Sequence, residues 1–160
     1  MLHIHIVHVG TIKEKYLSDA VSEYEKRLSA YCSIDNISVK EERLSDKPSE
    51  AETSNAIKKE GERILAALPQ RSYNIALCVE GKQMSSEKFS EKLMSVANEG
   101  FSDISLIIGG SDGLSDEVKS SCRMRLSVSE MTFPHQLMRV ILLEQLYRAF
   151  NIAAGGKYHK

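Results

Sequence analysis

The sequence lacks several features that would place it in a specialised class of protein. It contains no tryptophan and only three cysteines, an odd number without any CxxC pair, which argues against a disulfide framework. No apolar run is long enough to span a bilayer. The N-terminal MLHIHIVHVG has neither the basic region nor the small-residue cleavage site of a signal peptide. These absences predict a cytoplasmic protein with reduced thiols and no membrane partner.

A surplus of charge of one sign is also missing. Lysine and arginine number 21 against 22 aspartate and glutamate residues, which gives a net charge of −1. Free-standing nucleic-acid binders usually carry a strong basic surplus, so any RNA partner would have to be held by a local basic patch. The length of 160 residues and the hydrophobic content of 42% are those of an ordinary single domain, here residues 1–160.

Hydrophobic periodicity predicts strands and helices in regular alternation. Strands are expected at residues 2–9, 33–39, 73–79, 104–108 and 124–128. Helices are expected at residues 13–31, 56–68, 85–100, from 115 onward, and at 134–151, where Pro134 suits the first helical position. Residues 40–55 are predicted to be a polar loop whose lysines are solvated or touch phosphates. The alternation predicts an α/β fold with a mostly parallel sheet and helices on both faces.

Three histidines lie in the first predicted strand. Because successive side chains of a strand alternate, His3 and His5 project to one face and His8 to the other. Three metal ligands cannot converge from opposite faces, so solvent-facing or capping histidines are expected and no metal site is predicted.

Ligands of parallel sheets bind at the carboxyl ends of the strands, where three loops are expected, at residues 80–84, 109–113 and 128–133. In the last of them, Met131 and Phe133 beside free backbone N–H groups suit a ligand that is part flat ring and part polar. The alternative is that both side chains plug the core. The glycine-rich loop could cradle a phosphate, but it matches neither GxGxxG nor the P-loop pattern. The pattern therefore indicates a small adenine-like or polar ligand.

The last predicted helix changes its apolar side along its length. Leu137 and Ile141 belong to one apolar face in the first half, whereas Leu146 and Phe150 lie on the opposite side in the second half. A helix between its own sheet and a second subunit would have this pattern, which predicts a homodimer. The alternative is a helix buried on all sides within one domain.

Several motifs resemble those of one known family. They are IIGGSDGL at residues 107–114, MTFPHQLMRV at 131–140, EQLYRA at 144–149 and YHK at 158–160. These motifs are similar to those of the ribosomal RNA large-subunit methyltransferase H family, small SPOUT-type pseudouridine N3 methyltransferases of 23S rRNA. The resemblance covers essentially the whole chain. It implies a C-terminal trefoil knot over residues of about 73–160 and a homodimer that binds S-adenosylmethionine in the knot.

The resemblance also implies which residues form the site. The implied cofactor contacts are Leu77, Gly109, Val128, Ser129, Glu130, Met131, Thr132 and Phe133. The residues implied around the target base are Glu144, Arg148, Tyr158 and His159, with Lys157 and Lys160 as RNA contacts. Glu144 and Arg148 share one helix face and can pair. The alternative is that this pair is a surface ion bridge that contributes little to stability. The tail after Gly155 is expected to become ordered only when RNA binds, and the alternative is a frayed terminus.

The implied activity is methylation of N3 of a pseudouridine in an intersubunit stem-loop of 23S rRNA, on the assembled ribosome. N3 is a protonated imide nitrogen, so the reaction needs a proton acceptor or a cation that stabilises the developing anion. His159 or Glu144 would accept the proton and Arg148 would steady the base or a phosphate. Two alternatives remain: a SPOUT methyltransferase acting on tRNA, and a non-catalytic ribosome-binding protein that holds the cofactor as a structural or sensing ligand.

Overall fold

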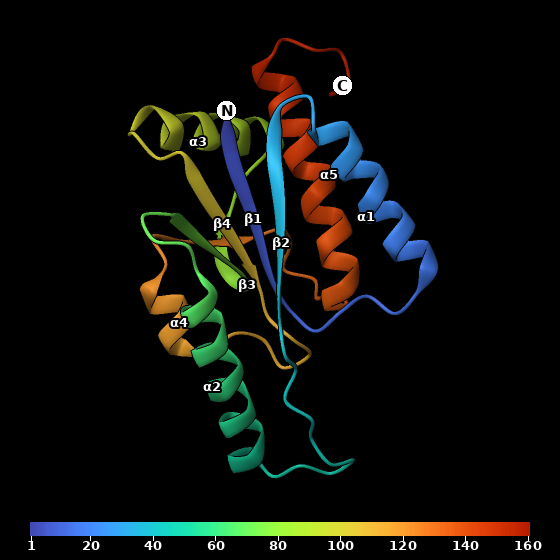
Figure 1. Cartoon of the computed structure of the whole chain (residues 1–160), viewed down its shortest axis with the longest axis vertical. Coiled ribbons are helices and arrows are strands. Elements are labelled where there is room, and N and C mark those ends of the chain that lie inside the picture. Colours follow the sequence, from blue (N-terminus) through green and yellow to red (C-terminus); the bar gives the residue numbers. More distant parts are fainter.

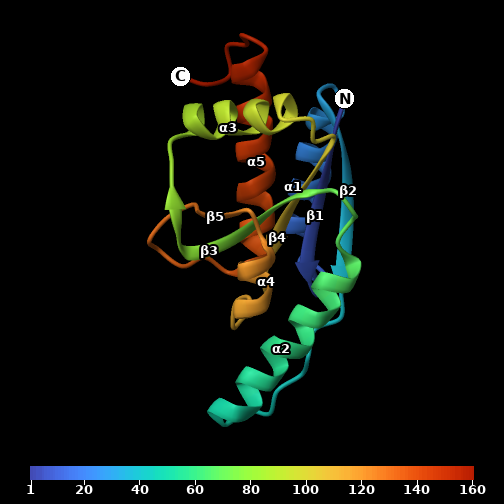
Figure 2. The same cartoon turned by 90° about the vertical axis from the view of Figure 1, so that its left-hand side faces the viewer.

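All 160 residues are described by the computed structural model, in which five parallel strands form one sheet. The strand order is β2-β1-β4-β3-β5 (Figures 1 and 2). The strands are β1 (Leu2–Val9), β2 (Cys32–Val39), β3 (Tyr73–Gln83), β4 (Asp103–Ile108) and β5 (Met124–Ser127). Every strand pair is parallel, so the predicted α/β fold with a parallel sheet is confirmed.

Helices cover both faces of the sheet. The helices are α1 (Lys15–Leu28), α2 (Glu50–Ala67), α3 (Ser86–Asn98), α4 (Asp116–Ser121) and α5 (His135–Ala153). Alternation along β1 assigns Ile4 and Ile6 to the larger core, which contains residues of α1, α3 and α5. Val7 and Val9 belong to the smaller core, together with residues of α2 and α4. The helices on both faces were thus predicted correctly.

The loop predicted at residues 40–55 is shorter than expected. Helix α2 begins at Glu50, because the Ser49 side chain caps it by accepting a hydrogen bond from the Glu52 N–H. Glu50 and Glu52 lie in the first turn, where carboxylates interact favourably with the helix dipole. The polarity of residues 50–55 therefore reflects the exposed start of a helix.

Strand β3 is longer than predicted. It continues past Val79 to Gln83, so most of the loop expected at residues 80–84 is strand. The pairing with β5 shifts register between Leu77 and Lys82, which is a bulge in β3. At Gly81 an added Cβ would lie 2.7 Å from the carbonyl carbon of Leu126, so only glycine permits this close approach of the two backbones.

Helix α5 has one core-facing side and one half-buried apolar side. Arg139, Leu142, Leu146 and Phe150 follow one stripe and are buried. Pro134 was predicted to be the first residue of this helix. It is instead the N-cap residue, and the helix begins at His135. The side that carries Leu137, Val140 and Ile141 is only half-buried. Of the apolar side predicted for the first half of the helix, Met138 and Val140 pack against the larger core of the same chain, which leaves Leu137 and Ile141.

The histidines of β1 differ in their surroundings. His3 is exposed, but His5 is buried and its Nε2 lies 2.8 Å from Asp103 Oδ1, so the expectation of a solvent-facing His5 is wrong. His8 is also buried and its Nδ1–H donates to the Gly10 carbonyl. Burial lowers the pKa of His8 to about 4, helped by the charge of Arg139. No three His, Cys, Asp or Glu side chains are grouped to hold a metal ion, and no helix could cross a membrane.

Candidate functional site

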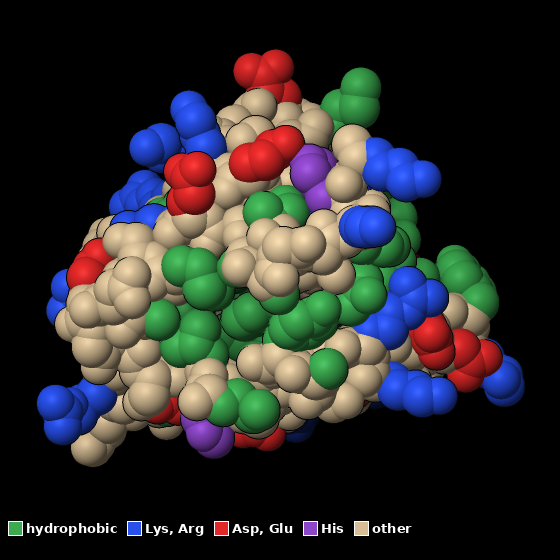
Figure 3. Space-filling view, turned by 90° about the horizontal axis from the view of Figure 1, so that it is seen from above, with side chains coloured by type: hydrophobic (Ala, Val, Ile, Leu, Met, Phe, Trp, Pro, Cys, Tyr) green, Lys and Arg blue, Asp and Glu red, His purple; other side chains and the backbone are tan.

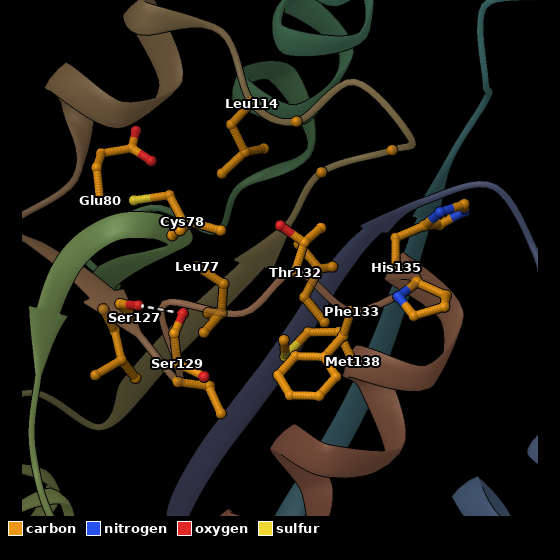
Figure 4. Close-up of a pocket in the computed structure, with 18 of the residues that line it drawn as sticks. Leu77, Cys78, Glu80, Leu114, Ser127, Ser129, Thr132, Phe133, His135 and Met138 are labelled. Carbon is orange, nitrogen blue, oxygen red and sulfur yellow. Dashed lines mark hydrogen bonds between the residues drawn. The ribbon is translucent and has the colours of Figure 1, made fainter.

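A cavity of about 770 Å³ lies at the carboxyl ends of β3, β4 and β5 (Figure 4). We call it the loop cavity, because its walls come from residues 77–80, 108–114, 126–129 and 131–135, together with Lys119 and Met138. Figure 4 shows side chains from β3, from the segment after β5 and from the start of α5 turned toward one space. Two of the three segments expected to hold a ligand, residues 109–113 and 128–133, therefore meet here, whereas only Glu80 of the segment 80–84 lines the cavity.

Seven of the eight residues implied for the cofactor line the loop cavity. They are Leu77, Gly109, Val128, Ser129, Met131, Thr132 and Phe133. The eighth, Glu130, has an exposed side chain and does not line the cavity. Met131 is 74% exposed, so this side chain does not plug the core, which was the alternative considered from the sequence.

Serine side chains fix the conformation of the segment after β5. Ser127 Oγ donates to the Ser129 carbonyl at 2.9 Å, the contact drawn in Figure 4. Ser129 Oγ in turn accepts from the Met131 N–H at 3.0 Å. Short hydroxyl-to-backbone bonds of this kind stabilise turns, and here they hold the segment open beside the sheet.

The glycine-rich wall depends on close backbone contacts. An added Cβ on Gly109 would lie 2.6 Å from the carbonyl carbon of Gly113, so a larger residue would force the turn apart. The Gly113 N–H donates to the Gly110 carbonyl, and Gly113 has a φ of +86°. This turn therefore offers a wall of backbone rather than side chains.

Cys78 and Lys119 lie outside the segments expected to hold a ligand and also line the cavity, together with Glu80, the first residue of the segment expected at 80–84. Lys119 on α4 forms an ion pair with Glu80 on β3 at the rim, and this contact lowers the pKa of Glu80. Burial raises the pKa of the Cys78 thiol, which argues against a thiolate nucleophile here. Cys78 follows Leu77 directly and could have been included on that ground, whereas nothing in the sequence linked α4 to the site.

The four residues implied around the target base lie together in a second cluster, here called the tail cluster: Glu144, Arg148, Tyr158 and His159. Arg148 Nη2 donates to Glu144 Oε1 at 2.6 Å, and Tyr158 OH donates to the same oxygen at 3.1 Å. Arg148 Nη1 also lies 3.1 Å from His159 Nδ1. The Glu144 and Arg148 side chains are 19% and 23% exposed, so this pair is not the exposed surface bridge considered as the alternative.

The tail is already docked in the free chain. Tyr158 N–H donates to the Asn151 side chain at 3.1 Å, and the Tyr158 ring packs 4.9 Å from that of Tyr147. His159 Nε2 lies 2.7 Å from the Glu87 carboxylate on α3. An added Cβ on Gly156 would lie 2.4 Å from Asn151 Nδ2, so glycine is required for this contact. The expectation that the tail orders only with RNA is therefore wrong.

The loop cavity and the tail cluster are separated within one chain. His135, at the start of α5, lines the cavity, while Arg148 lies thirteen residues further along the same helix. At about 1.5 Å per residue, this distance is about 20 Å. Side chains of one chain's tail cluster therefore do not reach a ligand in its own cavity.

Comparison with known proteins gives a consistent result. Residues 2–159 match the family described as "Predicted SPOUT methyltransferase". The chain is 46% identical to the ribosomal RNA large subunit methyltransferase H of Leuconostoc mesenteroides, over 99% of this chain and 100% of that protein. It is 48% identical to the protein of the same name from Streptococcus thermophilus, with the same coverage. A methylase family structure from Haemophilus influenzae has the same fold, with a TM-score of 0.60, 16% identity, and 98% and 70% of the two chains covered.

Proposed function

Because the chain belongs to the SPOUT methyltransferase family, we propose that it methylates N3 of a pseudouridine in 23S rRNA with S-adenosylmethionine as the methyl donor. The proposed target lies in an intersubunit stem-loop of the assembled ribosome, which would place the protein in the cytoplasm. The observation that carries the proposal is the loop cavity, since seven of the eight residues implied for the cofactor line it.

The residues of the loop cavity fit S-adenosylmethionine. Leu77, Phe133 and Met138 offer apolar surface for an adenine ring. The backbone of the glycine-rich turn and of residues 128–133 offers N–H and carbonyl groups for its polar edges. Glu130 would take part only through its backbone, because its side chain is exposed. When bound, the cofactor supplies an electrophilic methyl group on a sulfonium sulfur.

The proposed active form is a homodimer in which each site uses both chains. The half-buried side of α5 with Leu137 and Ile141 offers an apolar surface to a second copy. Packing of the two α5 helices would bring the tail cluster of one chain to the loop cavity of its partner. This arrangement accounts for the distance of about 20 Å between the two halves of the site in a single chain. Family membership also supports the trefoil knot proposed for residues of about 73–160.

Within the tail cluster, the residues are proposed to have different tasks. Arg148, Tyr158 and Gln145 all donate hydrogen bonds to the Glu144 carboxylate, so its oxygens are already engaged and the proposed role of Glu144 is to hold Arg148 and Tyr158 in place. We assign proton acceptance to His159, which would exchange its contact with Arg148 for the N3–H of the substrate. Arg148 would then stabilise the negative charge that develops on the base while the N–CH₃ bond forms and the C–S bond breaks.

One labelling experiment tests the proposal. The protein is incubated with methyl-labelled S-adenosylmethionine and, separately, with unmodified ribosomes, free 23S rRNA and tRNA, and the labelled nucleoside is identified after digestion. Label as 3-methylpseudouridine on ribosomes is the expected result. Label on tRNA would assign a different substrate within the same family. Cofactor binding without any label would favour the non-catalytic ribosome-binding alternative.

A further inference from the structure

A polar groove of about 460 Å³ lies where β3 meets α3. Its lining contains a single hydrophobic residue, Met84, and a single carboxylate, Glu91. Three lysines, Lys82, Lys88 and Lys92, face the same groove, which we call the lysine groove. The sequence predicted that any RNA partner would need a local basic patch, and this groove is a candidate for that patch.

The three lysines of this groove have no carboxylate partner. None of them forms an ion pair, whereas Lys119, Arg63 and Arg148 are neutralised by glutamates elsewhere in the chain. In a chain of net charge −1, three unpaired ammonium groups in one groove create a local positive potential. Figure 3 looks onto the end of the molecule that carries α3 and the C-terminus. There, lysine and arginine side chains lie along the margins of the face and hydrophobic ones in its centre.

A fourth cation extends the patch and is held in place by aromatic rings. The Arg123 guanidinium lies 4.9 Å from the centre of the Phe101 ring and 5.9 Å from that of Tyr73. The Lys92 ammonium lies 5.1 Å from the same Tyr73 ring. Both cations therefore lie beside one aromatic side chain, and cation–π contact keeps them oriented without neutralising their charge.

The lysine groove lies next to the loop cavity along β3. Strand β3 contributes residues 77–80 to the cavity, and residues 82–85 line the groove. At about 3.3 Å per residue, Glu80 and Lys82 are about 7 Å apart along the strand. Figure 2 shows this end of β3 rising from the sheet to the start of α3. A polymer with one unit at the mouth of the cavity would thus meet the lysines with its neighbouring units.

We propose that the lysine groove binds backbone phosphates of the RNA next to the nucleotide that meets the cofactor at the mouth of the loop cavity. The inference rests on the proposed function and adds the surface that holds the substrate. Lysine ammonium groups commonly contact phosphates, and such contacts position a nucleic acid without reading its sequence. An acidic protein is a poorer match, because a groove with one hydrophobic residue lacks the apolar centre of protein interfaces.

The test is a triple variant, Lys82→Gln, Lys88→Gln and Lys92→Gln, of the full-length protein. Its matched control is Lys13→Gln, Lys26→Gln and Lys58→Gln. These lysines have no ion pair and line neither the lysine groove nor the loop cavity. Binding to a 23S rRNA fragment is measured over a range of salt concentrations, together with kcat and KM for ribosomes and with cofactor affinity.

Each phosphate contact contributes about 0.7 to the slope of log K against log salt. In the groove variant, which loses three such contacts, the slope should therefore become less steep by about 2. The KM for ribosomes should rise roughly tenfold or more, while kcat and cofactor affinity stay unchanged. The control variant should keep the slope and KM of the wild type. Failure of the proposed function would look different, since the wild type itself would then transfer no methyl group to ribosomes.

Three results would overturn the groove assignment while leaving the activity intact. One is an unchanged salt slope and KM in the groove variant. Another is an equal loss of RNA binding in the control variant, which would mean that binding depends on the total charge of the protein and not on the groove. The third is weaker binding to ribosomes with unchanged binding to free rRNA, which would assign the groove to a ribosomal protein.

Discussion

At the scale of single residues, Glu144 shows how partners decide what a carboxylate can do. Its two oxygens accept hydrogen bonds from Arg148, Tyr158 and Gln145, and the contact with the Arg148 guanidinium is a charge-assisted one. The same contact raises the pKa of Arg148, mainly through the hydrogen bond to Glu144. Glu144 therefore orients the guanidinium that is proposed to face the target base.

We expect Glu144→Gln to lower the rate of methyl transfer at least about tenfold, since a misplaced Arg148 loses a charge-assisted bond of about 1.5–3 kcal/mol. Cofactor affinity should not change, because Glu144 does not line the loop cavity. Single-turnover rates and calorimetric cofactor titration measure the two effects. The control is Glu23→Gln on α1, which removes an exposed pair with Arg27. Equal losses in both variants would contradict the role of Glu144.

His8 makes stability depend on pH. Its pKa is lowered from 6.5 to about 4 in the folded chain, so the unfolded chain binds more protons between these two values. Stability from this residue is therefore present above pH 6.5 and is lost as the pH falls toward 4. At about 1.4 kcal/mol per unit of pKa, the loss is about 3 kcal/mol.

The expected result for His8→Gln is a smaller fall in the free energy of unfolding between pH 7 and pH 4 than in the wild type. Urea denaturation at several pH values measures it, and His3→Gln is the control, because His3 is exposed on the same strand. If the wild type and the His8 variant lose the same stability, burial of His8 does not control the acid sensitivity.

At the scale of elements, local sequence patterns predicted which strands and helices exist better than they predicted where these elements end. The alternation in β1 and the apolar runs of β3 and β4 identified strands correctly, because burial of one or both faces of a strand produces a recognisable hydrophobic pattern. The extension of β3 to Gln83 has no such hydrophobic pattern, since it depends on pairing with β5 some forty residues later in the chain. The docked tail was missed for the same reason, because Asn151 and Glu87 hold it through tertiary contacts.

The tail yields a prediction of its own. A chain truncated after Asn151 lacks Tyr158 and His159, and we expect it to bind the cofactor normally but to transfer no methyl group. Gly156→Ala keeps every tail residue but places a Cβ 2.4 Å from Asn151 Nδ2, which should displace the tail and lower activity as well. Filter binding of labelled cofactor and the ribosome assay separate the two steps. Full methylation by the truncated chain would contradict the role of the tail cluster.

At the scale of the whole molecule, the candidate site could be predicted only in two halves. Motif resemblance implied the residues of both proposed halves, and the parallel sheet explains why three segments meet in the loop cavity. Sequence spacing could not reveal that α5 holds the two halves apart, because that depends on which end of the helix meets the sheet. A second copy, related by twofold symmetry, would bring each tail cluster to the opposite cavity.

Complementation between two inactive chains tests this arrangement directly. Gly109→Val should block the loop cavity, because even a Cβ would lie 2.6 Å from Gly113, and Arg148→Ala should disable the tail cluster. Each variant alone should be inactive, with its fold checked by circular dichroism. After joint refolding in equal amounts, half the dimers are mixed, and each has one intact site made from both chains. About a quarter of wild-type activity should therefore return, whereas a site built within one chain would return none, because every chain in the mixture carries one of the two defects.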